Sequence, residues 1–229
     1  MKNILKLCSL ALLLFAATSC SLDNYDAPDS GLYGSVIDAE TGELVQQDII
    51  QGTKIYFIEH GWENPSTQQM VIKNDGTYCN SMMFAGTYSI YTDRNSNFAP
   101  VEEFELKIKG QTHCDLKVMP FIRISNAMIY LTGDKVRASF TISQTGYDNV
   151  ASIALFASSQ PVVGQFLNEA QLILPLGIHY AEPHSFSIDM NLDDFPTLSR
   201  GKTYYFRIGA LVAIGGAKYN YSPAVAIEL

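Results

Sequence analysis

The chain has 229 residues, a formal net charge of −8 and only 17% charged residues. A negative charge of this size argues against binding to nucleic acid and against docking on anionic lipid headgroups. The 13 tyrosines and 12 phenylalanines, with threonine, valine and isoleucine, suit the pleated, half-buried surface of a strand. We find no long apolar stripe with a helical period and caps, and we therefore predict an all-β protein.

The first 20 residues have the pattern of a lipoprotein leader. Lys2 and Lys6 precede an apolar run over residues 7–17, which is too short to cross a bilayer as a helix. Small residues then lead directly to Cys20, an arrangement that resembles a bacterial lipobox, in which the cysteine is acylated. We predict a signal peptide over residues 1–19 and lipidation of Cys20. The alternative is an ordinary cleaved signal in which Cys20 is incidental.

Residues 20–30 are predicted to form a short tether, because they contain three aspartates and no basic residue. Two or three acyl chains on one cysteine anchor a protein stably, since each buried methylene contributes about 0.8 kcal/mol. Acidic residues just after the cysteine resemble those of Bacteroidetes lipoproteins that reach the outer face. We therefore predict an outer-membrane protein held by its N-terminal lipid at the cell surface, with the periplasmic face as the alternative.

Residues 31–120 read as about seven short strands separated by turn signals, which suits a β-sandwich. The strongest turn signal is Asn74-Asp75-Gly76, since Asp and Gly tolerate a positive φ. The order GSVIDAETGELV, IKNDGTYCNSMMFAGTYSIYT and DLKVMP resembles the carboxypeptidase regulatory-like domain, which is a transthyretin-like (prealbumin-like) fold without catalytic function. The positions that match its motifs are Gly34, Val36, Asp38, Thr41, Gly42, Asp75, Gly76, Tyr78, Gly86, Thr87 and Tyr88.

Residues 121–229 are predicted to form a second sandwich. The stretch LSRGKTYYFRIGA resembles the F strand of fibronectin type III domains, an immunoglobulin-like fold. Leu198 lies six residues before Tyr204, whose hydroxyl would close a tyrosine corner, and Gly201 occupies the turn between them. Residues 158–177 fit this template less well, and we expect an inserted loop or a short helix there.

The layout as a whole is similar to a family of Bacteroidetes lipoproteins that carry these two sandwiches in this order. The match includes the opening DNYDAP at residues 23–28. The resemblance implies an association with outer-membrane glycan uptake systems of the starch-utilisation type. The resemblance implies no catalytic residues, because none are established for that family.

The motifs of the sequence agree with this expectation. The sequence contains no G-x-S-x-G, P-loop, H-E-x-x-H or G-x-G-x-x-G motif. In HYAEPH, His179, Glu182 and His184 offer imidazole and carboxylate ligands, but Pro183 makes the segment irregular and no fourth ligand is near. We expect a solvated loop there, and we predict neither an enzyme nor a cofactor or metal site.

Cys79 and Cys114 both lie in the first predicted sandwich, and they are the cysteines that remain after the leader and Cys20. They can form a disulfide in an oxidising compartment if the strands bring their Cα atoms within about 7 Å. The alternative is a pair of free thiols that pack as small apolar residues.

The candidate ligand-binding residues are mainly aromatic. Trp62, the only tryptophan, lies with His60 in the connection EHGWENPSTQQ between two predicted strands. An indole exposed there would stack on a sugar ring, whereas an indole folded back would cap the core, which the general tendency of tryptophan favours. Phe98 in DRNSNFAP, and Tyr219 and Tyr221 near the last hairpin, are weaker candidates.

We therefore expect a non-catalytic accessory subunit that binds ligand or acts as a scaffold in a glycan acquisition system. Its partners would be the membrane, through the lipid, a glycan and an outer-membrane glycan transporter complex. The alternative is a structural adhesin or fimbria-like subunit, which would present an unpaired strand edge for donor-strand addition. A hydrolase is the least favoured interpretation.

Overall fold

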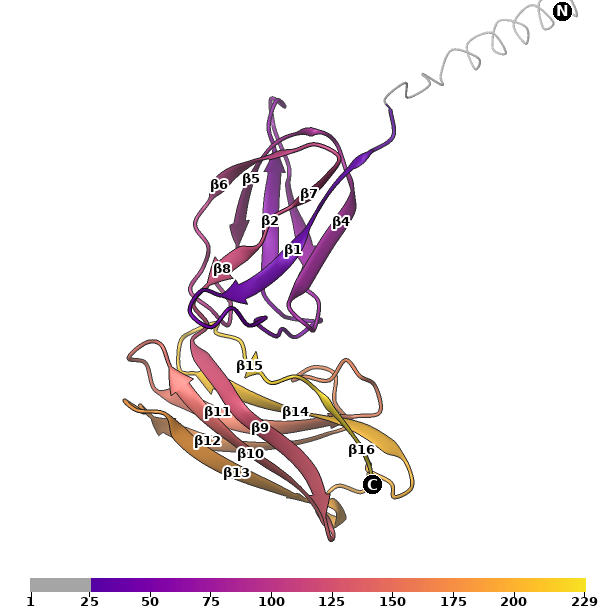
Figure 1. The fold of residues 1–229 in the computed structure, drawn as a ribbon, viewed down its shortest axis with the longest axis vertical. Coiled ribbons are helices and arrows are strands. Elements are labelled where there is room, and N and C mark those ends of the chain that lie inside the picture. Colours follow the sequence, from indigo (N-terminus) through magenta and orange to yellow (C-terminus); the bar gives the residue numbers. More distant parts are fainter. Residues whose placement is uncertain (1–25) are drawn as a thin grey trace, which may run out of the picture.

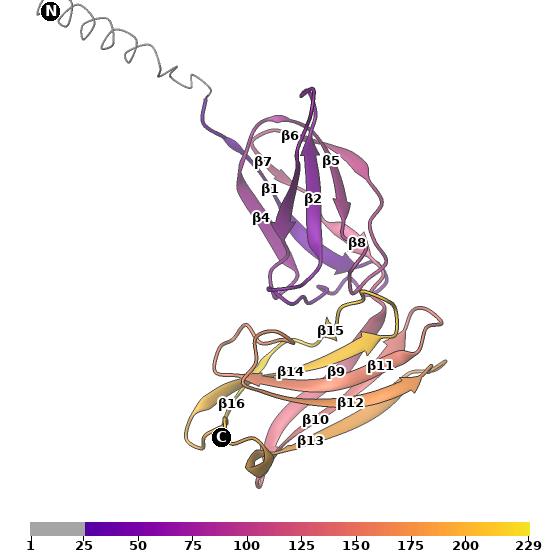
Figure 2. The same cartoon turned by 180° about the vertical axis from the view of Figure 1, so that it is seen from behind.

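The structure is a computed structural model that describes residues 26–229. The predicted signal peptide, Cys20 and the first residues of the tether lie outside this range. The described chain consists of strands and one 3₁₀ turn, and it forms two β-sandwiches stacked end to end (Figures 1 and 2). The predicted all-β fold with tandem sandwiches is confirmed. Residues 26–229 include no helix of the length and apolarity needed to cross a membrane.

The first sandwich contains eight strands. They are β1 (Ser30–Asp38), β2 (Lys54–Glu59), β3 (Thr67–Val71), β4 (Thr77–Met83), β5 (Gly86–Thr92), β6 (Phe104–Ile108), β7 (Gln111–His113) and β8 (Leu116–Val118). One sheet has the order β4-β1-β7, with β8 also paired to β1, and the facing sheet has the order β3-β2-β5-β6. From Leu32 to Asp38 of β1, buried residues alternate with exposed or half-buried ones, and Leu32 and Val36 pack with Ile55 and Phe57 of β2 in the core.

Two connections in the first sandwich differ from their sequence pattern. The stretch THCDLKVMP has the sequence pattern of a single strand, but the chain divides it between β7 and β8, which both run parallel to β1. The Asn74-Asp75-Gly76 turn does reverse the chain, with a φ of 88° at Gly76. It connects β3 and β4, however, which belong to opposite sheets. It is therefore a crossing between sheets and not a hairpin.

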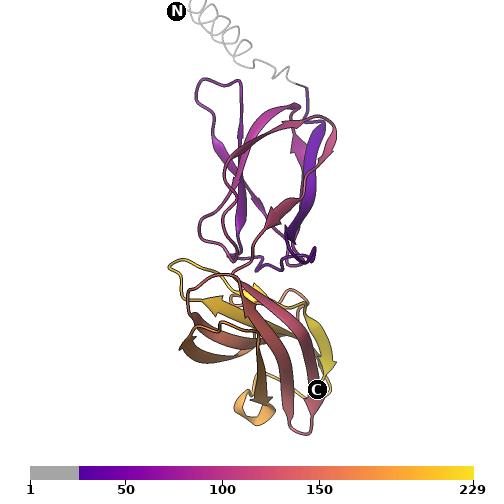
Figure 3. The same ribbon diagram turned by 60° about the vertical axis from the view of Figure 1, so that its left-hand side comes forward.

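The second sandwich contains the remaining strands. They are β9 (Ile122–Thr132), β10 (Lys135–Gln144), β11 (Val150–Ser158), β12 (Ala170–Ile178), β13 (His184–Asn191), β14 (Thr203–Val212), β15 (Asn220–Tyr221) and β16 (Val225–Glu228), with the 3₁₀ turn η1 (Leu192–Asp194) after β13. The sheet β13-β10-β9 faces the sheet β12-β11-β14-β15, in which β16 also pairs with β14 (Figure 3). Phe140, Ile153, Phe206 and Ile208 lie in the core between them.

The segment 158–177 is only in part the loop or short helix that we expected. Residues 159–169 form a loop, but β12 follows and pairs antiparallel with β11. Pro175 weakens the strand pattern in the sequence, because proline cannot donate a backbone hydrogen bond. It is tolerated here because β12 is the edge strand of its sheet.

The predicted tyrosine corner is present. The Tyr204 hydroxyl accepts a hydrogen bond from the Ser199 N–H (3.0 Å) and donates one to the Thr197 carbonyl (3.3 Å). Leu198 and Tyr204 are both buried. This contact fixes the start of β14, which carries an arginine to the junction between the sandwiches.

Strand β9 contains a bulge at Asn126. Its φ of 51° is the only positive value at a non-glycine residue within residues 26–229. Ser125 pairs with Thr141 and Met128 with Ser139, so two residues of β9 lie opposite one of β10. Because side chains alternate along a strand, this extra residue keeps Ile129 in the core instead of turning it to solvent.

Candidate functional site

The two sandwiches are joined through a fully buried arginine. Arg207 of β14 donates hydrogen bonds to the carbonyls of Ser222 (2.8 Å) and Val163 (2.9 Å) in its own sandwich. It also donates to the carbonyls of Gln47 (2.9 Å) and Asn74 (3.0 Å) in the first sandwich. One planar side chain therefore connects four backbone segments across the junction.

The charge of Arg207 is retained at neutral pH. Desolvation by burial lowers the pKa of Arg207 to about 10, which is still well above 7. Its guanidinium carbon lies 4.3 Å from the centre of the Tyr221 ring, a cation–π contact. The Tyr221 hydroxyl in turn donates a hydrogen bond to the Asp48 carboxylate (3.3 Å) of the first sandwich. These contacts compensate the cation for its lost hydration.

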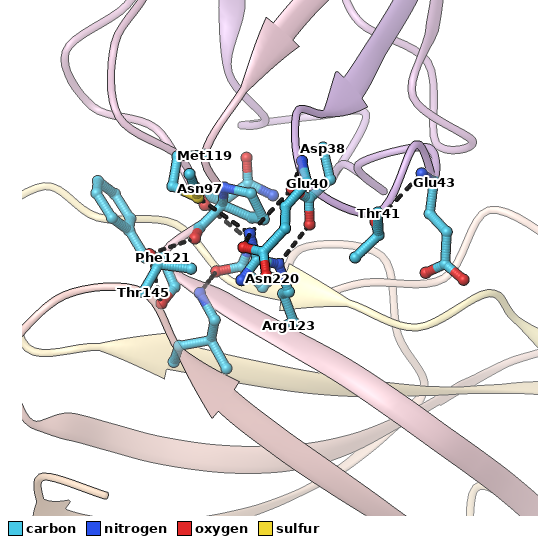
Figure 4. A network of polar contacts seen from close by, with 12 residues as sticks. Asp38, Glu40, Thr41, Glu43, Asn97, Met119, Phe121, Arg123, Thr145 and Asn220 are labelled. Carbon is cyan, nitrogen blue, oxygen red and sulfur yellow. Dashed lines mark hydrogen bonds and ion pairs between the residues drawn. The ribbon is translucent and has the colours of Figure 1, made fainter. Parts of the chain in front are cut away.

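Two asparagines form a second link beside Arg207. The Asn220 side chain donates to the Asn97 carbonyl (2.8 Å), and the Asn97 side chain donates to the Tyr219 carbonyl (3.2 Å). The Asn220 side-chain oxygen accepts from the Ile122 N–H (3.0 Å). Asn97 and Asn220 are almost completely buried, and Figure 4 shows them at the centre of the junction.

An ion pair lies at the surface side of the junction (Figure 4). Arg123 of β9 contacts both carboxylate oxygens of Asp38 at the end of β1 and also binds Glu40 (2.8 Å). Burial alone would raise the pKa of Asp38, but hydrogen bonds from Arg123 and the Glu40 N–H hold the pKa below its ordinary value. Asp38 is therefore an ionised structural partner of Arg123.

An open cavity of about 910 Å³ lies next to this ion pair, with walls from both sandwiches. We call it the interdomain cleft. The first sandwich lines it with Asp38, Thr41, Glu43 and Leu44, and the second sandwich lines it with Arg123, Ser125, Asn126 and Ser143.

A second, smaller cavity of about 410 Å³ lies in the loop between β2 and β3, and we call it the tip pocket. It is lined by Trp62 with Glu59, Glu63, Asn64, Pro65, Ser66 and Gln68. The Trp62 side chain is 58% exposed, so the alternative in which it caps the core is wrong. The pocket combines one aromatic plane with carboxylates, amides and a hydroxyl.

The base of this loop is held by hydrogen bonds to β5. The His60 N–H donates to the Thr87 carbonyl (2.9 Å), and His60 Nε2 lies 2.9 Å from the Ser89 hydroxyl. Gly61 then turns the chain with a φ of 99°, which favours glycine. His60, a predicted ligand-binding residue, thus lies beside the tip pocket and positions the loop that carries Trp62.

The other three aromatic candidates are buried. Phe98 is 0% exposed in the core of the first sandwich. Tyr219 and Tyr221 are 3% and 7% exposed and pack on Phe156, with ring centres 5.4 and 6.0 Å away. The prediction of Phe98 and Tyr219 as binding residues is wrong, because both segments lie at the junction, where the second sandwich covers loops that look open in the sequence. Tyr221 is also mostly covered there, but it lines the interdomain cleft.

Of the two alternatives for the cysteine pair, the disulfide is not formed. Cys79 and Cys114 are free cysteines in the described chain. Cys79 pairs with Tyr33 on one side of β1, while the Cys114 N–H donates to the Tyr33 carbonyl on the other side. Because neighbouring strands are about 4.8 Å apart, the two Cα atoms are separated by about 10 Å, which exceeds the reach of a disulfide.

The histidine segment after β12 is a loop only up to Pro183, because His184 begins β13. Within residues 26–229, no group of three or more histidine, cysteine, aspartate or glutamate residues is arranged to bind a metal ion. The ring of His184 lies 4.6 Å from that of Tyr180 and 4.8 Å from that of Phe186, so it belongs to an aromatic cluster.

Three comparisons place these features among known proteins. The sequence matches "Protein of unknown function (DUF3823) N-terminal domain" over residues 30–119 and "Domain of unknown function (DUF3823_C)" over residues 122–226. The comparison with curated proteins found no match.

Among solved structures, one is a candidate carbohydrate-binding protein from Bacteroides uniformis. It is 33% identical, covers 88% of this chain and 100% of its own, and has a TM-score of 0.76. DUF3823 family proteins from Parabacteroides merdae and Bacteroides ovatus are 24% and 21% identical, with TM-scores of 0.75 and 0.73. The matches cover 89% and 87% of this chain and 100% and 99% of theirs, and they show the shared fold.

Proposed function

This chain belongs to the DUF3823 family, and on that premise we propose that it is a non-catalytic carbohydrate-binding protein whose ligand stacks on Trp62. The exposed indole of the tip pocket is the observation that carries the proposal. The similarity to a candidate carbohydrate-binding protein supports the same ligand class.

The chemistry of the tip pocket suits a sugar. The apolar face of a pyranose ring packs on an indole, and ligand sites commonly combine such a surface with a few polar groups. The carboxylates of Glu59 and Glu63 accept hydrogen bonds from hydroxyls, and the amides of Asn64 and Gln68 both donate and accept. Because His60 fixes the base of the loop, less conformational entropy is lost on binding.

The same pocket argues for binding and against hydrolysis. A glycosidase needs two carboxyl groups on opposite sides of the scissile bond, one of them buried enough to act as an acid. Here Glu63 is exposed and Glu59 is half-buried; Glu59 ends β2 and Glu63 lies in the short loop that follows it. They are placed to bind hydroxyls on one side of a ligand.

We further propose that the protein is an accessory subunit of a glycan acquisition system, anchored in the outer membrane through Cys20. The leader pattern and the acidic residues after Cys20 support this location. Replacing Cys20 by alanine should release the protein from membranes or leave it unprocessed. Normal lipid labelling of Cys20→Ala would contradict the anchor.

A glycan array with the mature chain lacking its lipid tests the ligand class. A sugar identified in this way should change the Trp62 fluorescence, and Trp62→Ala should weaken its binding by about 1–3 kcal/mol, as at other aromatic stacking contacts. The matched control is Tyr147→Ala, which removes an aromatic ring that is 93% exposed on the other sandwich. Wild-type affinity in Trp62→Ala would exclude the tip pocket as the site.

A further inference from the structure

We propose that the interdomain cleft is a second binding site, which takes a segment of an uncharged, hydroxyl-rich glycan chain. This inference rests on the proposed function for its ligand class, but it concerns different residues. A protein with one site in the tip pocket and one in the interdomain cleft would bind a long polysaccharide at two places. Two linked contacts raise the overall affinity well above that of either one.

The cleft is preformed by the junction. Its volume of about 910 Å³ lies in the range of ligand sites, which are common between domains. One wall comes from residues 41–46 of the first sandwich and the other from residues 122–127 of the second. The buried hydrogen bonds of Arg207 and Asn220 fix these walls relative to each other.

The polar groups that line the cleft suit hydroxyls. Ser125, Asn126 and Ser143 line it, and their side chains take no part in the hydrogen bonds that join the two sandwiches. An amide and two hydroxyls supply both donors and acceptors, as sugar hydroxyls require. The bulge at Asn126 interrupts the alternation of β9 next to the cleft, and bulges of this kind often redirect side chains beside sites.

The charge of the cleft favours an uncharged ligand. Its one arginine, Arg123, is already paired with Asp38 and Glu40. Glu43, which also lines the cleft, adds a further negative charge. An acidic sugar would therefore meet no free cation and would be repelled by the carboxylates. Leu44, 41% exposed, offers an apolar surface for the CH groups of a neutral sugar ring.

The experiment counts the sites. Isothermal titration uses a panel of uncharged hexasaccharides (gluco-, manno- and xylo-oligosaccharides) and an oligogalacturonate, while the fluorescence of Trp62 reports the tip pocket alone. The cleft variant is the double substitution Asn126→Gly with Ser143→Ala. Glycine accepts the φ of 51° at this position, so the bulge is kept while the amide is lost. Ser187→Ala, an exposed serine on β13 that does not line the cleft, is the matched control.

We expect two equivalents of a neutral hexasaccharide per wild-type chain. The cleft variant should bind the second equivalent at least tenfold more weakly, with an unchanged melting temperature and unchanged Trp62 titration. Trp62→Ala should keep the cleft equivalent, and the oligogalacturonate should not compete for it.

The other possible results separate the cleft proposal from the tip-pocket proposal. One equivalent that Trp62 reports and that the cleft variant leaves intact would refute the cleft and uphold the proposed function. Binding that survives Trp62→Ala and disappears in the cleft variant would uphold the cleft and refute the tip pocket. If no neutral hexasaccharide binds the wild-type chain, the cleft proposal is wrong, and the glycan array decides the tip pocket.

Discussion

Replacing Arg207 by alanine should destabilise the protein by about 3–5 kcal/mol, as expected when one partner of a buried charged contact is removed. Four carbonyls lose a charged donor, and each such hydrogen bond contributes about 1.5–3 kcal/mol. The cost of burying the guanidinium offsets part of the stabilisation by these hydrogen bonds. The fall of its pKa from 12.5 to about 10 corresponds to roughly 3 kcal/mol at 1.36 kcal/mol per pH unit. The net loss of stability is limited further, because the sandwiches of the variant can separate at the weakened junction. Water then reaches the four carbonyls that Arg207 binds in the wild type.

Urea unfolding followed by circular dichroism measures this loss. We expect a lower midpoint for Arg207→Ala and, where the junction opens first, a transition with two phases. Arg207→Lys should recover only part of the stability, since an ammonium lacks the planar fork that reaches four carbonyls. Arg137→Ala is the matched control, because Arg137 pairs with Asp189 at the surface and its loss should cost about 1 kcal/mol, well below the loss in Arg207→Ala. A wild-type midpoint in Arg207→Ala would refute the reasoning that Arg207 holds the sandwiches together.

Three further predictions follow from the environments of single side chains. Trp62→Ala should change the free energy of unfolding by less than about 1 kcal/mol, and the wild-type fluorescence should be red-shifted and quenched by iodide; a blue-shifted, shielded spectrum would contradict its exposure. Because the folded pKa of Asp38 lies below 3.8, its pair with Arg123 stabilises the fold above that pH and is lost on acidification through the folded pKa. Asp38→Asn should therefore flatten part of the acid branch of a stability–pH curve, and an unchanged branch would count against it. Cys79 should react quickly with a thiol reagent and Cys114 slowly, because burial raises the pKa of the Cys114 thiol; a mass two units lower than that of the reduced chain would reveal a disulfide after all.

The architecture was predictable from local patterns. Alternating residues, turn signals and the spacing of Leu198 and Tyr204 each depend on a few neighbours in the sequence, and they indicated two sandwiches and the tyrosine corner. Strand β12 was not predicted, because Pro175 interrupts its strand pattern in the sequence. The proline is tolerated because β12 is an edge strand.

The site was less predictable, because it depends on which loops the second sandwich covers. Phe98 and Tyr221 lie in segments that read as open connections, yet both are buried. Arg207 was not predicted as a junction residue. A charged residue inside the apolar run TYYFRIGALV is the signal that could have found it, since such a residue must have buried partners.

The register of the first sandwich also fixes the direction in which the tip pocket faces. Ser30, where β1 begins, pairs with Met83, and Glu59, where β2 ends, pairs with Tyr88, so the chain enters the fold at the end that carries the tip pocket. In Figure 1 this end is opposite the second sandwich. An anchor at Cys20 would thus hold Trp62 close to the bilayer and project the interdomain cleft away from it. With that anchor, a glycan bound at both sites would lie along the long axis of the molecule, with one end at the membrane.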